Sequence, residues 1–96
     1  MSLYKNANIR KTRKKLDLLD KKVLNLIKKR TILVDRILRE KKFKSQIVDN
    51  KRIKIILKNI RRKSKAKNID TNLTNKIWKS MIRGFINYEI KKFKKR

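Results

Sequence analysis

Apolar side chains recur along the first half of the chain in steps that alternate between four and three residues. The series contains, in order, Ile9, Arg13, Leu16, Asp20, Val23, Ile27, Arg30, Val34, Ile37 and Lys41, and we refer to it as the apolar stripe. Positions three and four residues apart share one face of a helix. We therefore predict a helix over about residues 8–42, roughly 50 Å long at 1.5 Å per residue.

Two shorter helices are predicted in the second half of the chain. Asp49 can cap the second helix, and Asp70 or Thr71 can cap the third. Their apolar positions are Ile53, Ile56, Leu57 and Ile60 in the second helix and Ile77, Trp78, Met81, Ile82, Phe85 and Phe93 in the third. We expect residues 43–48 to form a loop, and residues 61–67 to be the frayed end of the second helix followed by a loop. A rod as long as the first helix cannot bury its stripe against itself, so it needs the later helices, a partner chain or both.

Charged residues interrupt these stripes at positions where a helix is normally apolar. The apolar stripe contains Arg13, Arg30 and Lys41 but only one acid, Asp20, and Glu89 lies on the apolar side of the third helix. A buried cation without a partner is costly. Asp20 could pair with a neighbouring arginine, and Glu89 could be the counter-ion of Lys41. Because three cations share one stripe, we favour a pocket for a small anionic ligand over purely structural ion pairing.

Composition narrows the fold class and the possible chemistry. The chain has 96 residues, no Pro and one Gly, which disfavours sheets and their turns and indicates a single all-α domain over residues 1–96. Cys and His are absent, so thiolate nucleophiles, imidazole bases, disulfides and the usual zinc sites are excluded. No apolar run is long enough to span a membrane. We expect a soluble, cytoplasmic protein in which residues 1–7 form a flexible segment or leader.

The formal net charge of +26 makes nucleic acid an obvious partner to consider. The cations are spread along the chain, aromatic residues are few, and no known nucleic-acid motif is present. We therefore expect most lysines to be solvated on helix faces and nucleic acid to bind only non-specifically. A basic helical protein that binds nucleic acid or another anionic ligand without catalysis remains an alternative function.

The charged and apolar positions together resemble the all-helical, type II chorismate mutase family, which includes isochorismate pyruvate-lyase. The first part of the match is Arg13-x2-Leu16-x2-Leu19-Asp20-x2-Val23-x2-Leu26-Ile27-x2-Arg30, followed by Lys41 and by Asp49-x2-Arg52. The second part is Ile77-Trp78-x2-Met81-Ile82-x2-Phe85-x3-Glu89. The resemblance covers nearly the whole chain, and its first part is the more specific.

The resemblance implies an intertwined homodimer of three-helix protomers that binds a dicarboxylate, chorismate or isochorismate, without a cofactor or metal. The substrate carboxylates would be held by Arg30 of one protomer and Arg13 of the other. Lys41 would donate to the ether oxygen of the breaking bond, and Arg52 would contribute charge to the pocket. Asp49 falls where the mutases contact the region of the ring hydroxyl.

Three positions depart from the usual mutase pattern. Glu89 replaces the Gln of many bacterial members, and it must be protonated to help at the ether oxygen, so we expect activity to rise toward acidic pH. Ile53 replaces a Glu that contacts the ring hydroxyl, and Phe85 replaces a small polar residue. The changes at Ile53 and Phe85, and the spacing from Lys41 to Arg52, resemble the lyase. Asp49 resembles the mutase, and the lyase carries Gln at position 89. We favour the mutase, with the lyase as the alternative.

Overall fold

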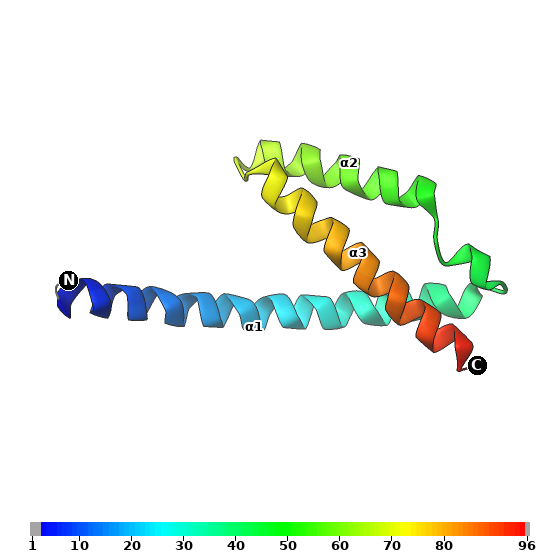
Figure 1. The fold of residues 1–96 in the computed structure, drawn as a ribbon, viewed down its shortest axis with the longest axis horizontal. Coiled ribbons are helices and arrows are strands. Elements are labelled where there is room, and N and C mark those ends of the chain that lie inside the picture. Colours follow the sequence, from blue (N-terminus) through cyan, green and yellow to red (C-terminus); the bar gives the residue numbers. More distant parts are fainter. Residues whose placement is uncertain (1–2, 96) are drawn as a thin grey trace. The chain divides into compact units, whose positions relative to one another are not determined.

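The computed structural model describes the backbone of residues 3–95 and the side chains of residues 6–95. In this part the chain consists of helices joined by short connections. Its elements are α1 (Leu3–Glu40), the 3-10 helix η1 (Lys44–Gln46), α2 (Asn50–Ala66) and α3 (Thr71–Lys94) (Figure 1). The predicted all-α protomer with a long first helix is confirmed. The chain divides after Leu33 into two compact units.

The first unit consists of α1 up to Leu33, and its apolar side chains are exposed. Ile9, Leu16 and Val23 of the apolar stripe are 44%, 52% and 50% exposed. Leu19, Leu26 and Leu33 follow one another at intervals of seven residues beside the stripe and are exposed as well. An exposed apolar face of this kind is typical of an interaction surface.

The second unit contains the end of α1 from Val34 onward, η1, α2 and α3. Its buried apolar side chains are Leu38 of α1, Ile47 after η1 and Ile82 of α3. The predicted stripe of α3 is buried or half-buried from Trp78 to Phe93. Ile77 differs from this prediction, since it is 48% exposed.

Both predicted caps are present at the starts of α2 and α3. The Asp49 carboxylate accepts a hydrogen bond from the backbone N–H of Arg52 at 3.0 Å. The Asp70 carboxylate accepts one from the N–H of Asn72 at 2.9 Å. Each cap satisfies a donor that the first helical turn leaves without a backbone partner.

The connection between α2 and α3 is shorter than predicted, because α2 remains helical through Ala66. Asn68 adopts a positive φ of 57°, and the N–H groups of Ile69 and Asn68 donate to the carbonyl oxygens of Ser64 and Lys65. This is the Schellman arrangement that ends many helices. The expectation that residues 61–67 fray is therefore wrong, since this capping motif holds the last turn.

A buried pair of hydroxyl groups joins α2 to α3 beside this turn. Ser64 Oγ and Thr74 Oγ1 lie 2.8 Å apart, and Ser64 Oγ also donates to the carbonyl oxygen of Ile60 at 2.7 Å. Ser64 and Thr74 are both buried. The pair fixes the start of α3 against the end of α2 and so helps to orient the side chains further along α3.

The first helix and the loop after it differ from the prediction at their ends. α1 ends at Glu40, and the predicted loop 43–48 contains η1. The side-chain oxygen of Gln46 accepts hydrogen bonds from the N–H groups of Lys42 and Phe43 at 2.7 and 2.9 Å, which closes the turn. Residues 3–7, which we expected to be flexible or a leader, are helical, and residues 1–2 lie outside the described part.

Candidate functional site

An ammonium group and a carboxylate, both on predicted site residues, meet in the second unit. Lys41 directly follows α1 and Glu89 lies in the last third of α3, and Lys41 Nζ is 3.2 Å from Glu89 Oε2. Their side chains are 18% and 12% exposed. The pair is thus largely shielded from solvent. Electrostatic interactions are stronger in such a site than at the surface.

The two partners offer complementary chemistry to a bound molecule. The lysine ammonium is a compact charge that can donate to a single oxygen atom. The carboxyl group of Glu89 accepts hydrogen bonds when ionised and can donate one when protonated. Phe85, one helical turn before Glu89, is half-buried, and its ring meets that of Tyr88 edge to face at 6.5 Å.

The predicted residues of the second helix lie in its cap and first turn. The Asp49 carboxylate serves the N-cap, which is a structural role that the sequence also predicted. The Arg52 side chain is exposed, and Ile53 is half-buried. At position 53 the first turn of α2 therefore presents an aliphatic group rather than an acid.

The two predicted carboxylate-binding arginines both belong to the first unit. Arg13 is exposed and borders a shallow cavity of about 360 Å³ together with the stripe residues Ile9 and Leu16. Arg30 is half-buried. The two are 17 positions apart in one continuous helix, a separation of about 26 Å at 1.5 Å per residue. Arg13 and Arg30 of the same chain therefore cannot hold one small molecule together.

A second polar cluster in the second unit was not predicted from the sequence. Asp35 near the end of α1 accepts a hydrogen bond from the Tyr88 hydroxyl at 2.8 Å and forms an ion pair with Lys92 at 2.9 Å. The Lys92 ammonium also lies 5.5 Å from the centre of the Tyr88 ring, a cation–π distance. The hydrogen bond from Lys92 has the largest effect on Asp35 and the one from Tyr88 the next largest, and both lower the pKa of Asp35. The hydrogen bond to Asp35 raises the pKa of Lys92.

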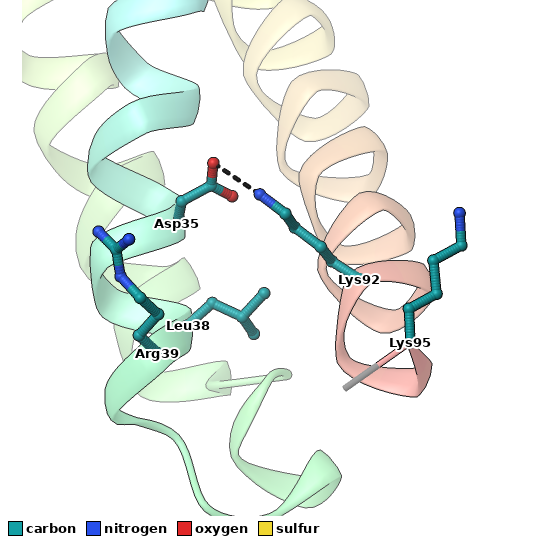
Figure 2. Close-up of a pocket in the computed structure, with 5 residues that line it drawn as sticks. All are labelled: Asp35, Leu38, Arg39, Lys92 and Lys95. Carbon is teal, nitrogen blue, oxygen red and sulfur yellow. Dashed lines mark ion pairs between the residues drawn. The ribbon is translucent and has the colours of Figure 1, made fainter.

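Asp35 and Lys92 of this cluster border an open cavity of about 450 Å³, together with Leu38, Arg39 and Lys95. Figure 2 shows the ion pair across the cavity and the ammonium of Lys95 turned away from Asp35. None of the predicted site residues lines this cavity. Because Asp35 neutralises Lys92, we interpret the cluster as a structural contact that holds the end of α1 against α3. Asp35 lies outside the apolar stripe, and Arg39 is its one basic neighbour three or four residues away along the helix, so little in the sequence pointed to this cluster.

The described residues contain neither a metal-binding cluster nor a membrane-spanning helix. Residues 3–95 contain no group of three or more His, Cys, Asp or Glu placed to hold a metal ion. Over the same residues, no helix combines the length and the apolar character that crossing a membrane requires.

Comparison with known protein families gives a match that extends over most of the chain. The family model described as chorismate mutase type II matches residues 12–90. No curated protein matches the chain, and no solved structure matches it. The matched range begins just before Arg13 and ends just after Glu89, so it includes every predicted site residue.

Proposed function

The chain belongs to the type II chorismate mutase family, and on this premise we propose that it is a chorismate mutase, which rearranges chorismate to prephenate. The observation that carries the proposal is the largely buried pair of Lys41 and Glu89, 3.2 Å apart. These are the two residues that the family resemblance assigns to the ether oxygen of the breaking bond.

The reaction suits the chemical groups that this sequence supplies. The rearrangement is intramolecular and needs no nucleophile, so a chain without Cys or His can carry it out. Catalysis consists of holding a dianion in its reactive conformer and stabilising the negative charge that develops on the ether oxygen. Arginine fits a carboxylate with two parallel hydrogen bonds, and lysine serves a single oxygen. In our proposal Arg13 and Arg30 hold the carboxylates, Arg52 adds positive charge, and Lys41 donates to the ether oxygen.

Glu89 has a conditional role in this mechanism. In its ionised form it pairs with Lys41 and would repel charge that builds on the ether oxygen. In its protonated form it donates a hydrogen bond to the same oxygen and leaves the lysine ammonium available to the substrate. Turnover therefore rises toward acidic pH.

A site that uses both arginines requires two chains. Because Arg13 and Arg30 are about 26 Å apart along α1, we propose a homodimer in which Arg13 of one protomer completes the site that contains Arg30 of the other. The exposed apolar side chains of α1 from Ile9 to Leu33 support this arrangement. A sustained alternation of four- and three-residue steps is also the pattern with which helices pack against each other along their length.

Isochorismate pyruvate-lyase, which forms salicylate and pyruvate, is the second candidate within the family. Ile53 and Phe85 favour it, since both place half-buried apolar groups where the mutase pattern is polar. Asp49 favours the mutase, although its carboxylate also caps α2.

Purified protein given chorismate and isochorismate separately tests the proposal, with substrate loss followed by absorbance and products identified by chromatography. Prephenate from chorismate is the expected result, and it would make Ile53 a tolerated variation. Salicylate plus pyruvate from isochorismate alone would assign the lyase instead. If neither substrate is consumed at acidic or neutral pH, the proposed activity is wrong and the chain is a non-catalytic member of the fold.

A further inference from the structure

A regular row of lysines runs along α1 on a different face from the apolar stripe. Adjacent lysines occur as pairs that repeat every seven residues, and all of these side chains are exposed. The members are Lys14, Lys15, Lys21, Lys22, Lys28 and Lys29, and we call this row the lysine ridge.

Helix geometry separates the ridge from the apolar stripe. Seven residues make about two helical turns, so consecutive pairs are about 10.5 Å apart and the ridge is about 22 Å long. At about 100° per residue, each ridge position lies roughly 130° around the helix axis from the middle of the stripe. The ridge therefore stays accessible when a second chain covers the stripe.

The ridge is not organised as an ordinary solvated helix face. Such faces gain stability from acid–base pairs three or four residues apart, yet no ridge lysine forms an ion pair within the described residues. Asp17 lies three residues after Lys14 and four before Lys21, but it is exposed and pairs with neither. A biased composition accounts for many lysines, but it does not account for their pairing at a constant interval on one face.

We propose that the lysine ridge binds the phosphate backbone of double-stranded nucleic acid, independently of the mutase site. A duplex is a long polyanion with one charge per about 1.7 Å of its axis, which a straight row of evenly spaced ammonium groups can follow. Leu18 and Asn25 lie between the lysine pairs and Ile32 follows the last pair, so the ridge has no aromatic ring on which bases of a single strand could stack. Binding thus involves the backbone alone and does not depend on sequence.

An anionic membrane surface fits this face less well. Helices that lie on membranes bury an apolar face opposite their cations. Here the face opposite the ridge is the apolar stripe, which the proposed dimer covers. Leu18 and Ile32 are exposed on the ridge, but they are isolated aliphatic groups among lysines.

Two variants with equal net charge test the proposal against the effect of overall charge. The ridge variant changes its six lysines to Gln, which preserves helix propensity. The control variant changes six other exposed lysines to Gln, namely Lys54, Lys58, Lys63, Lys65, Lys67 and Lys79. Circular dichroism checks the folding of both. Binding to a mixed-sequence DNA duplex of about 20 base pairs, about 68 Å long, is measured by fluorescence anisotropy over a range of salt concentrations.

The ridge variant is expected to bind the duplex at least tenfold more weakly than the control variant. In the ridge variant, the slope of log affinity against log salt concentration should be smaller in magnitude than in the wild type by about 5. Each of the six lysines neutralises one phosphate, and each neutralised phosphate contributes about 0.9 to the slope. Variants that change only one lysine pair should each lose about a third of this slope, which provides a test should the full variant not fold. Equal losses in the ridge and control variants would overturn the proposal, because net charge alone would explain binding. A larger loss in the control, or ridge-dependent binding to vesicles of anionic lipid that exceeds binding to the duplex, would overturn it as well.

Discussion

The ammonium of Lys41 lies 3.2 Å from the carboxylate of Glu89, and this pair links the residue after α1 to the last third of α3. Both side chains are largely buried, so the pair contributes to the packing of the second unit as well as to the proposed chemistry. Variants at either position must therefore be measured for folding and for turnover.

Replacing Glu89 by Gln is expected to increase turnover of chorismate at neutral pH and to flatten its dependence on pH. The amide donates a hydrogen bond at every pH and no longer pairs ionically with Lys41. The measurement is kcat/KM of the wild type and of Glu89→Gln from about pH 5 to 8. Glu40→Gln is the matched control, because Glu40 is exposed. A wild-type profile that is flat over this range would contradict the role given to Glu89.

Replacing Lys41 by Ala removes the group that donates to the ether oxygen. Loss of one such donor typically lowers kcat by about 100- to 1000-fold, and we expect a loss of this size. The variant should also unfold about 1–3 kcal/mol more easily, because the carboxylate of Glu89 loses its partner. Lys42→Ala is the control, since the Lys42 side chain is exposed and only its backbone N–H is hydrogen-bonded to Gln46. Turnover in Lys41→Ala equal to that of the control would show that the lysine has no role at the ether oxygen.

Asp35 should make stability depend on pH in the acidic range. Lys92 and Tyr88 lower its pKa from the ordinary value of 3.8, so its stabilising contribution is complete above 3.8 and disappears as the pH falls through the lowered pKa. Thermal unfolding followed by circular dichroism from about pH 7 to about pH 2 should show a smaller acid-induced loss in Asp35→Asn than in the wild type. Asp17→Asn, at an exposed position, should leave the loss unchanged. The same loss in all three proteins would remove Asp35 as its source.

The buried hydroxyl pair of Ser64 and Thr74 should show coupling between α2 and α3. Ser64→Ala removes the acceptor 2.8 Å from Thr74 and is expected to cost about 1–3 kcal/mol of unfolding free energy. Combining it with Thr74→Val removes both polar groups and should cost less than the sum of the single changes. Urea unfolding of the four proteins in the cycle measures this coupling. Ser80→Ala, on an exposed part of α3, should change stability by less than about 0.5 kcal/mol. Additive single changes would mean that the two hydroxyl groups do not interact.

Periodicity and capping chemistry made the helices predictable from the sequence. The stripe from Ile9 to Lys41 required one long helix, and Asp49 and Asp70 marked the starts of the next two. The extension of α2 to Ala66 was not predictable in this way, because it depends on Asn68 in a left-handed conformation and on Ser64 bonded across to α3. Asn can adopt that conformation but does not require it. Asn68 therefore does not mark a helix end in the way that Gly at the same position would.

The site was predictable where its residues interrupt a stripe and was missed where they do not. Lys41 and Glu89 attracted attention as charges on apolar faces, and the structure brings them together. Asp35 and Lys92 occupy faces that periodicity assigns to solvent, so their ion pair follows only from how α1 and α3 pack. The meeting of Arg13 with Arg30 of a second chain stays a prediction.

Subunit complementation tests whether one chorismate-rearranging site is built from two chains. Arg13→Ala and Arg30→Ala should each be folded and nearly inactive, because every site lacks one carboxylate-binding arginine. When the two are unfolded together and refolded as a mixture, about half of the dimers contain one of each, and each of these has one intact site of two. We expect the mixture to recover about a quarter of the wild-type turnover of chorismate. Activity in the mixture no greater than the average of the two separate variants would contradict it.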